Sequence, residues 1–381
     1  MGLYRRLIRP VLFALPPESA HQVSVHASRL AGTIPAIRRR VRESLLVDEP
    51  CLANEVAGLS MVNPIGLAAG WDKSGHALSM LPYLGFGAVE IGSISARPSI
   101  GNPRPRLFRL PDDEAIIVNY GLPNDGAERV AQRLAGMARP SRSDESFVPL
   151  GINCVATNDG PGSACSTRQI VEDYCTSVRL LAGHADYLSL NLSCPNIEKG
   201  QHLFEQPNAI RSLLRRLTEH LTINCPVFLK VPPSVDPADH DRWLAEVDEF
   251  PMVKGFVFNL PSDDRAKGQL VTPAMKWKAM PGAVSGPPVE AVINQCIAML
   301  YRKLNPTRHA IVGAGGVGNA EQAYRKLRLG ASMVQLYTAL VYRGPGVVRE
   351  INQGLVELLY RDGVANVCEI IGVDATSGWI D

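Results

Sequence analysis

The chain of 381 residues is predicted to fold as an α/β protein built as a (β/α)8 (TIM) barrel with an N-terminal amphipathic helical hairpin. From residue 60 onward, short apolar runs rich in β-branched residues alternate with longer segments of helical periodicity. Eight such pairs over roughly 300 residues is the number that a barrel of this kind requires. The apolar runs are continuous, as is typical of parallel strands covered by helices on both faces. A doubly wound open sheet is the alternative.

The expected elements follow from these local patterns. The eight strands are predicted at 65–69, 88–91, 148–153, 187–192, 227–231, 255–260, 310–313 and 333–337. Helices are predicted at 74–84, 125–138, 168–183, 207–221, 237–249, 287–303, 319–329 and 345–361. The polar residues over 139–146 predict an exposed loop.

The N-terminal segment is basic and predicts a pair of amphipathic helices. Residues 1–40 hold seven arginines against the single acid Glu18. Apolar residues recur at helical spacing in the first 15 residues and again over 18–31. The longest apolar run is far too short to cross a bilayer. Two interpretations remain open on this pattern alone: a hairpin lying in a membrane interface, and a surface helix pair packed on the barrel.

Composition excludes several classes of function. The net charge of only +2 excludes a surface that binds nucleic acid as a whole. The eight cysteines lie at least ten residues apart, so there is no Cys-x-x-Cys pair for a metal, an iron–sulfur cluster or a redox dithiol. Such dispersed cysteines, without a secretory signal, are typical of a cytosolic protein. We therefore expect two parts, the basic segment 1–42 and a barrel domain over 43–381.

Polar side chains follow nearly every expected strand, at the end where barrel enzymes carry their chemistry. Lys73 follows the first strand, Lys230 lies at the end of the fifth, and Asn259 lies at the end of the sixth. Amides, hydroxyls and two lysines around one opening suit a large polar heterocycle that carries a phosphate. A buried ammonium without a partner is costly, so an acidic group or an electron-rich ligand is expected beside such a lysine.

Residues 313–318 read Gly-Ala-Gly-Gly-Val-Gly and match the Gly-x-Gly-x-x-Gly pattern of a dinucleotide-binding turn. That pattern needs an acidic residue about 20 positions later, and no Asp or Glu lies between Glu321 and Glu350. The segment falls in the seventh unit, where barrels bind phosphate through backbone N–H groups. We therefore expect a site for the phosphate of flavin mononucleotide (FMN), to which residues 282–286 contribute.

Five segments together resemble the dihydroorotate dehydrogenases. They are 63–73 (Asn-Pro-Ile-Gly-Leu-Ala-Ala-Gly-Trp-Asp-Lys), 90–93 (Glu-Ile-Gly-Ser), 102–109, 191–196 (Asn-Leu-Ser-Cys-Pro-Asn) and 334–337. Residues 15–21 (Leu-Pro-Pro-Glu-Ser-Ala-His) and the basic hairpin resemble the quinone-dependent, membrane-associated class (class 2) of that family. The resemblance implies an FMN-binding barrel, a quinone tunnel formed by the hairpin, and peripheral contact of residues 1–40 with the cytoplasmic face of a membrane, here the bacterial inner membrane.

The resemblance also implies a reaction of pyrimidine biosynthesis, the oxidation of (S)-dihydroorotate to orotate. In this family a base takes the proton from C5 while a hydride passes from C6 to flavin N5, and a quinone then reoxidises the flavin. Cys194 stands at the position of the base, where the membrane class usually has Ser and the soluble class has Cys. A thiol has an unperturbed pKa of about 8.5 and can serve as that base. Lys73 is the second residue assigned to catalysis.

Binding roles follow from the same resemblance. Flavin contacts are assigned to Ala69, Gly70, Ser93, Asn153, Asn191, Lys230, Ser285, Gly286, Gly315, Gly316, Tyr337 and Thr338. Substrate contacts are assigned to Lys73, Asn119, Asn191, Asn196 and Asn259, and quinone-tunnel positions to His21, Arg109 and Tyr337. No metal site is expected.

The substrate pocket departs from the family pattern at three positions. Val118 stands where the family has Asn, and Leu260-Pro261 replaces two threonines, so a hydroxyl for the substrate carboxylate is lost. These departures leave a second hypothesis open: an FMN oxidoreductase on the same scaffold that acts on another ring or unsaturated metabolite. A third is a flavin-binding or membrane-scaffold protein without activity. The survival of Lys230 and Cys194 argues against this third hypothesis.

Overall fold

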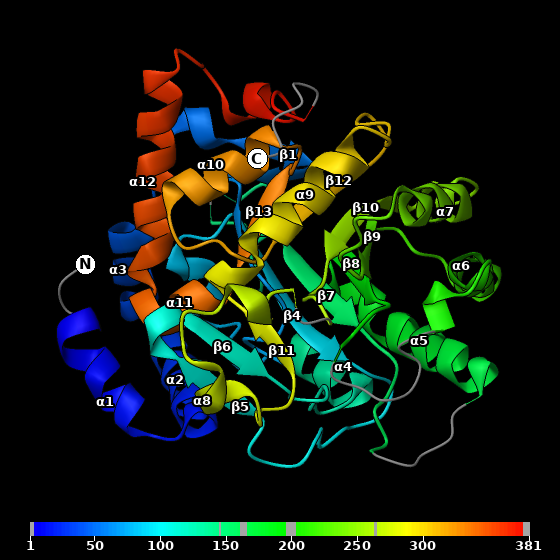
Figure 1. Ribbon diagram of the computed structural model, residues 1–381, viewed down its shortest axis with the longest axis horizontal. Helices are drawn as coiled ribbons and strands as arrows, with labels where there is room; N and C mark the ends of the chain where they lie inside the picture. Colours follow the sequence, from blue (N-terminus) through cyan, green and yellow to red (C-terminus); the bar gives the residue numbers. More distant parts are fainter. Residues whose placement is uncertain (1–3, 145, 161–165, 196–202, 263–264, 376–381) are drawn as a thin grey trace.

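Eight parallel strands close into a barrel in the order β10-β12-β13-β3-β4-β7-β8-β9 (Figure 1). This computed structural model describes residues 4–144, 146–160, 166–195, 203–262 and 265–375. The strands are β3 (Ile65–Leu67), β4 (Ala88–Ile94), β7 (Leu150–Cys154), β8 (Tyr187–Asn191), β9 (Val227–Val231), β10 (Val253–Phe258), β12 (Ala310–Ala314) and β13 (Met333–Leu336). The predicted barrel is confirmed, and its closure excludes the open sheet.

Helices surround the barrel, and seven of the eight predicted ones are present. They are α4 (Ala127–Ala135), α5 (Thr167–Leu181), α6 (Ala209–His220), α7 (Pro237–Val247), α9 (Glu290–Tyr301), α10 (Ala320–Arg328) and α12 (Gly346–Arg361). In α6 the buried residues Ile210, Leu213, Leu214 and Leu217 recur at helical spacing, so one apolar stripe faces the sheet. Two short helices, α8 (Ala274–Trp277) and α11 (Thr338–Arg343), were not predicted.

The helix predicted over 74–84 is wrong. Only a 3₁₀ turn, Leu81–Leu84, lies in that segment. The Asp72 carboxylate accepts hydrogen bonds from three of the next five backbone amides, at 2.7–3.3 Å, and so holds the chain in a loop. Gly75, with φ at +74°, also lies outside the helical region.

Two small sheets accompany the barrel and were not predicted. The hairpin of β1 (Asn54–Val56) and β2 (Leu59–Met61) packs against the first residues of the barrel strands, Tyr187 and Met333 among them, and covers the N-terminal end of the barrel. An antiparallel sheet in the order β11-β6-β5 is formed by Ala283–Ser285, Ala115–Val118 and Leu107–Leu110. This sheet lies at the opposite end of the barrel, where residues of β5 contact the N-terminal helices.

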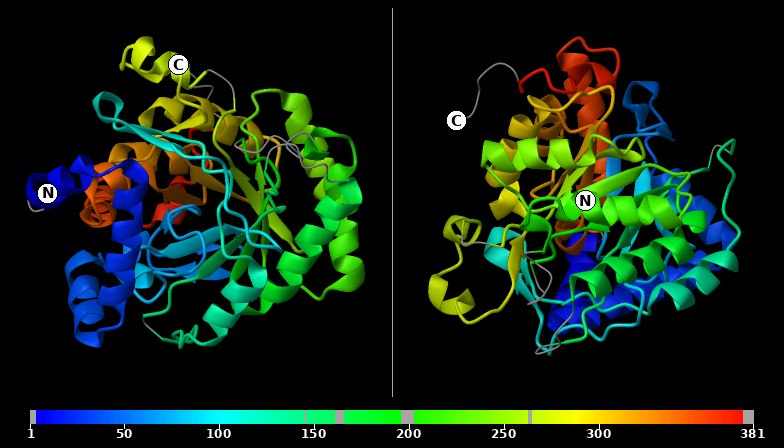
Figure 2. Two further views of the ribbon diagram at one scale, coloured as in Figure 1. Left: turned by 90° about the horizontal axis from the view of Figure 1, so that it is seen from below. Right: turned by 90° about the vertical axis from the view of Figure 1, so that its right-hand side faces the viewer.

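The N-terminal helices lie along one side of the barrel (Figure 2). A π-helical turn, Tyr4–Ile8, leads into α1 (Arg9–Ala14) and α2 (Pro17–Gly32), which are the predicted pair. A third helix, α3 (Pro35–Leu45), was not predicted, and the expected boundary between residues 42 and 43 falls inside it. The Tyr4 hydroxyl donates to the Val341 carbonyl at 2.8 Å, which fastens this segment to α11. Within the described part of the chain, no helix combines the length and apolar character that a membrane crossing requires.

Candidate active site

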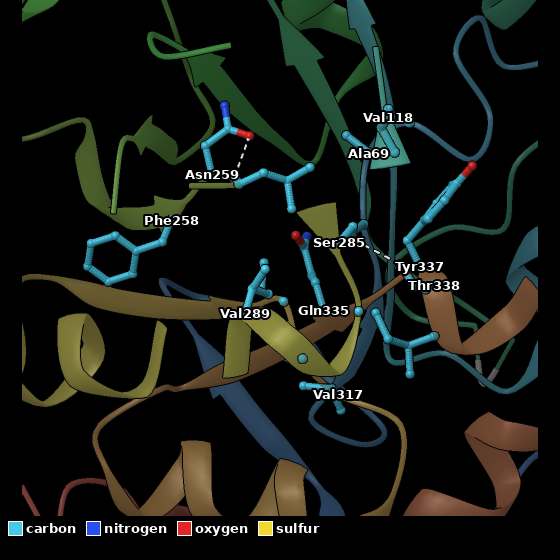
Figure 3. A pocket seen from close by; sticks show the side chains of 18 of the residues that line it. Ala69, Val118, Phe258, Asn259, Ser285, Val289, Val317, Gln335, Tyr337 and Thr338 are labelled. Atoms are coloured by element: carbon cyan, nitrogen blue, oxygen red, sulfur yellow. Dashed lines mark hydrogen bonds between the residues drawn. The ribbon is translucent and has the colours of Figure 1, made fainter. Parts of the chain in front are cut away.

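The carboxyl ends of the barrel strands surround one cavity with an empty volume of about 1340 Å³, its open mouth included. Most of the predicted site residues line it: Ala69, Gly70, Lys73, Ser93, Asn191, Cys194, Lys230, Asn259, Ser285, Gly286, Gly315, Gly316, Tyr337 and Thr338. Figure 3 shows Phe258 and Asn259 across the cavity from Ala69 and Val118, with Val289 and Val317 below. Residues that are far apart in the sequence, from the first barrel strand to the last, therefore line one cavity.

Glycines let the backbone itself form part of the cavity wall. Gly70 has φ at +107°, and a Cβ added there would meet no atom within 4 Å. At Gly316, with φ at +72°, a Cβ would lie 2.6 Å from the backbone of Glu290. The loop 313–318 is held from α10, because the Gln322 side chain accepts a hydrogen bond from the Gly318 amide at 2.8 Å. These positions require glycine, and they keep side chains out of the space that a phosphate would need.

Hydrogen bonds join the polar groups at the strand ends. The Asn259 amide donates to Asn191 Oδ1 at 2.9 Å, and the Asn191 amide donates to Ser93 Oγ at 3.0 Å. Ser93 in turn donates to Asn153 Oδ1. Asn153 is fully buried and is not among the residues that line the cavity, so it orients Ser93 from beneath.

A buried carboxylate lies under this chain of amides. Glu90 is 0% exposed and accepts from Asn153 and Gln335 at 2.9 Å each and from the Tyr187 hydroxyl at 3.2 Å. Gln335 lines the cavity, and its Oε1 has no hydrogen-bond partner among the described residues although it is buried. Buried polar atoms are rarely left in this state, and Oε1 is available to accept a hydrogen bond from a molecule in the cavity. The sequence contained Gln335 only as part of a family motif, and no role was predicted for it.

Lys230 projects from the end of β9 and is 9% exposed. Its ammonium makes no hydrogen bond or ion pair within the described part of the chain. Because Lys230 lines the cavity, its ammonium is placed to interact with an electron-rich ligand there. This agrees with the role that the family resemblance implies for Lys230.

Lys73 lies between the cavity and the N-terminal helices. Its Nζ donates to the Gly70 carbonyl at 2.8 Å, contacts His21 Nε2 at 3.1 Å, and lies 4.1 Å from the centre of the Tyr120 ring. Burial lowers the pKa of Lys73 to about 8. Burial, together with the Lys73 charge, holds the pKa of His21 well below its usual range. The imidazole of His21 is therefore neutral and can accept a hydrogen bond from the Lys73 ammonium.

A second cavity, with an empty volume of about 890 Å³ including its mouth, lies under α1 and α2. Its walls are mostly apolar, and all three predicted tunnel residues, His21, Arg109 and Tyr337, line it. Tyr337 lines both cavities, so they share a wall. The His21 ring lies 5.9–6.4 Å from the rings of Trp71, Tyr120 and Tyr337.

Arg109 fastens α1 to the sheet. Its guanidinium donates to the carbonyl oxygens of Leu12, Phe13 and Leu15, at 3.1 and 3.3 Å for the first two, and it lies 4.4 Å from the centre of the Phe13 ring. Leu12 and Phe13 belong to the C-terminal turn of α1 and Leu15 follows it directly, at the end where helical carbonyls lack partners within the helix. Arg109 thus acts as a C-terminal cap that shapes the second cavity.

Two predicted substrate residues are not placed in the cavity. The Asn119 side chain accepts a hydrogen bond from Asn102 at 3.1 Å, and the neighbouring Val118 lines the cavity instead. Asn196 lies outside the described residues. Leu260 also lines the cavity, so two of the three departures from the family pattern face the substrate space.

Comparison with known proteins agrees with this geometry. Residues 51–359 match the family described as Dihydroorotate dehydrogenase. The dihydroorotate dehydrogenase (quinone) of Acidithiobacillus ferrooxidans is 37% identical over 378 residues, which cover 97% of this chain and 99% of that protein. The protein of the same name from Haloarcula marismortui is also 37% identical, with 97% and 98% covered. A ligand-free DHODH structure from Eimeria tenella superposes with a TM-score of 0.79 at 30% identity, covering 94% of this chain and 99% of that one. The chain belongs to the dihydroorotate dehydrogenase family, as its motifs predicted.

Proposed function

We propose that this chain oxidises (S)-dihydroorotate to orotate with bound FMN and delivers the electrons to a quinone. The observation that carries the proposal is the pair of cavities that share Tyr337. One is lined by amides, lysines and glycines and suits a polar ring with a phosphate. The other is apolar and opens beneath the N-terminal helices. The relatives named for this reaction match the chain over almost its whole length, the hairpin included.

The residues of the first cavity fit FMN. The glycines of the loop 313–318 and Gly286 leave room for a phosphate. Gln335 Oε1 offers an acceptor, and Lys230 places a cation where negative charge on a reduced ring would be stabilised. When bound there, FMN supplies the chemistry of accepting a hydride equivalent and releasing its electrons to a second substrate.

The protein's own groups would bind the substrate and move one proton. Cys194 lines the cavity and would take the C5 proton of dihydroorotate. Asn191 and Asn259 orient one another, and each retains donor or acceptor capacity for the edge of a pyrimidine ring. Lys73 supplies a cation for the substrate carboxylate. The apolar residues Val118 and Leu260 close the pocket without contributing a hydrogen bond.

The second cavity would admit the quinone from a membrane surface. Most of the large apolar side chains left exposed in the described structure belong to the N-terminal segment: Leu7, Ile8, Val11, Leu15, Val23, Leu30, Ile34 and Ile37. The seven arginines of residues 1–40 alternate in the sequence with these apolar side chains. Exposed apolar residues with a basic fringe are typical of peripheral binding at an anionic interface. We place the protein at the cytoplasmic face of a membrane, held there through residues 1–40.

The decisive experiment separates the two half-reactions. Purified full-length protein should be yellow, should bleach on anaerobic addition of dihydroorotate, and should regain its colour when a short-chain ubiquinone is added. The product should absorb as orotate in stoichiometric amount. A yellow protein that dihydroorotate does not bleach would contradict the proposed substrate. Bleaching without recovery by quinone would contradict the proposed acceptor.

A further inference from the structure

Glu18 and Arg106 form an ion pair that the proposed chemistry does not use. Glu18 lies in the first turn of α2, and its carboxylate accepts from Arg106 Nη2 at 2.7 Å and from Nε at 3.2 Å. The Arg106 side chain is only 7% exposed. It also donates to the carbonyl oxygens of Ile100 and Asn102 at 2.6 and 2.9 Å. A guanidinium held at this many points has one fixed position.

The fixed guanidinium lies over the Tyr120 ring, and the Lys73 ammonium lies over the same ring. The Arg106 carbon Cζ is 5.4 Å from the centre of the Tyr120 ring, and Lys73 Nζ is 4.1 Å from the same centre. Tyr120 is 7% exposed and lines the first cavity. Both of these groups are cations that lie against the ring, so the place of the Tyr120 ring and the places of the two cations are linked.

The contacts return to α2 one helical turn later. Lys73 meets His21, which follows Glu18 by three residues on the same helix. Residues i and i+3 lie on one face of a helix, so α2 holds Lys73 directly through His21 and indirectly through Arg106 and Tyr120. The result is a closed ring of contacts with α2 on one side and the cavity wall on the other.

We propose that Glu18 is a positioning residue for substrate oxidation: by fixing Arg106, and through it the Tyr120 ring, α2 sets the place of the Lys73 ammonium at the cavity. The N-terminal hairpin then belongs to the dihydroorotate site as well as to the quinone site. This inference rests on the proposed function. The electrostatics agree with it: burial disfavours the charged form of Lys73, Asp72 and then Glu18 favour it, and Arg106 disfavours it. Without Glu18, a buried guanidinium would stand unbalanced near that ammonium.

The test measures substrate oxidation alone, with quinone absent. Glu18→Gln in the full-length flavin-loaded protein should bleach with dihydroorotate about ten- to a hundredfold more slowly than the wild type, because the lysine is displaced. The high-pH limb of the bleaching rate should also move to lower pH, because a carboxylate that favours the charged form of Lys73 is lost. Arg106→Lys should slow bleaching as well, since lysine cannot form the two-pronged contact. Glu18→Asp should recover part of the rate.

Arg104→Gln is the matched control. Arg104 pairs with the same carboxylate at 3.1 Å, but its side chain is 65% exposed and it is not one of the two cations over the Tyr120 ring. The bleaching rate and pH profile of the Arg104→Gln variant should stay at wild-type values. Flavin content and thermal melting show whether each variant folds, and if Glu18→Gln does not, Arg106→Lys and Glu18→Asp decide. Wild-type bleaching and pH profile in a folded Glu18 or Arg106 variant would overturn the inference. Wild-type protein that dihydroorotate fails to bleach would instead overturn the proposed function.

Discussion

Single residues in the first cavity are arranged for a ligand more than for the stability of the protein alone. Gln335 Oε1 is buried without a hydrogen-bond partner among the described residues, and the Lys230 side chain, which is 9% exposed, lines the same cavity. Both groups are available to a complementary group, so a ligand in the cavity would satisfy what folding leaves open. Behind the cavity wall, Glu90 and Asn153 lie below Ser93 and are joined to it and to each other by hydrogen bonds within the protein. Rigid support thus lies directly beneath the groups that remain available.

Cys194 is the residue whose role is most directly tested. Cys194→Ala should abolish bleaching by dihydroorotate while FMN stays bound, because the variant lacks a proton acceptor but keeps the flavin contacts. Cys194→Ser should retain part of the rate and shift the pH profile upward, since a hydroxyl is the weaker acid. Stopped-flow absorbance under anaerobic conditions gives the rate, and the visible spectrum gives the bound flavin. Fast bleaching in the alanine variant would remove Cys194 from the reaction.

Lys73 predicts a pH dependence of anion binding. Burial lowers its pKa to about 8, so the ammonium is present below that pH and is lost above it. Orotate is an anion, so its dissociation constant should not change with pH near neutrality. Above pH 8 it should rise about tenfold per pH unit, as expected for the loss of one proton. Titration of the flavin spectrum with orotate measures this constant. Lys73→Met should bind weakly with no inflection, and an unchanged inflection in that variant would assign the proton to another group.

Among the elements, the barrel strands could be predicted because burial on both faces makes each of them a continuous apolar run. The segment 74–84 shows the limit of such patterns, since the single carboxylate of Asp72 captures the amides that a helix would need. Strands β6 and β11 pair across 165 residues of sequence and have only three or four residues each, so no local signal marks them. Helix α3 was missed because its four arginines conceal a short apolar stripe.

The candidate site was predictable to a similar degree. Residues at strand ends, such as Lys230 and Asn191, follow from the topology once the barrel is known. Asn119 does not, because a shift of one residue in an extended segment turns a side chain to the opposite face, and here Val118 takes the cavity side. The roles of Gln335 and Glu18 depend on partners far away in the sequence, which only the folded chain brings near.

The cap on α1 predicts a defect confined to the quinone. Arg109→Met should leave bleaching by dihydroorotate near wild type and slow the reoxidation of the reduced protein by a short-chain ubiquinone about tenfold, because the freed carbonyls of α1 loosen the second cavity. Double-mixing stopped flow measures both steps in one sample. Arg361→Met, at an exposed arginine at the end of α12, is the control and should change neither step. Equal slowing of both steps by Arg109→Met would show that α1 does not act on the quinone separately.

At the scale of the whole molecule, the two cavities would divide the proposed reaction in space. The polar cavity and the apolar cavity are distinct, and Tyr337 lies in the wall that they share. The charge is divided in the same way. Residues 1–40 carry a formal charge of +6, which leaves −4 for the remainder of the chain. We therefore propose that the basic, apolar end turns toward an anionic surface, with the barrel away from it.

The proposed orientation predicts how the protein should behave with lipid vesicles. It should float with vesicles that contain anionic lipid at low salt and bind less as salt rises, because the arginines are attracted through a screened potential. Val11→Asp, at a side chain 67% exposed on α1, should weaken flotation while melting and bleaching by dihydroorotate stay at wild-type values. Tyr360→Asp changes another large exposed side chain, 88% exposed at the far end of α12, and should float as the wild type does (Figure 1). The contrast between these two variants isolates the N-terminal face, because each adds one negative charge at an exposed position and only the position differs. If Val11→Asp floats fully, or if both variants fail to float, the membrane does not bind through this face.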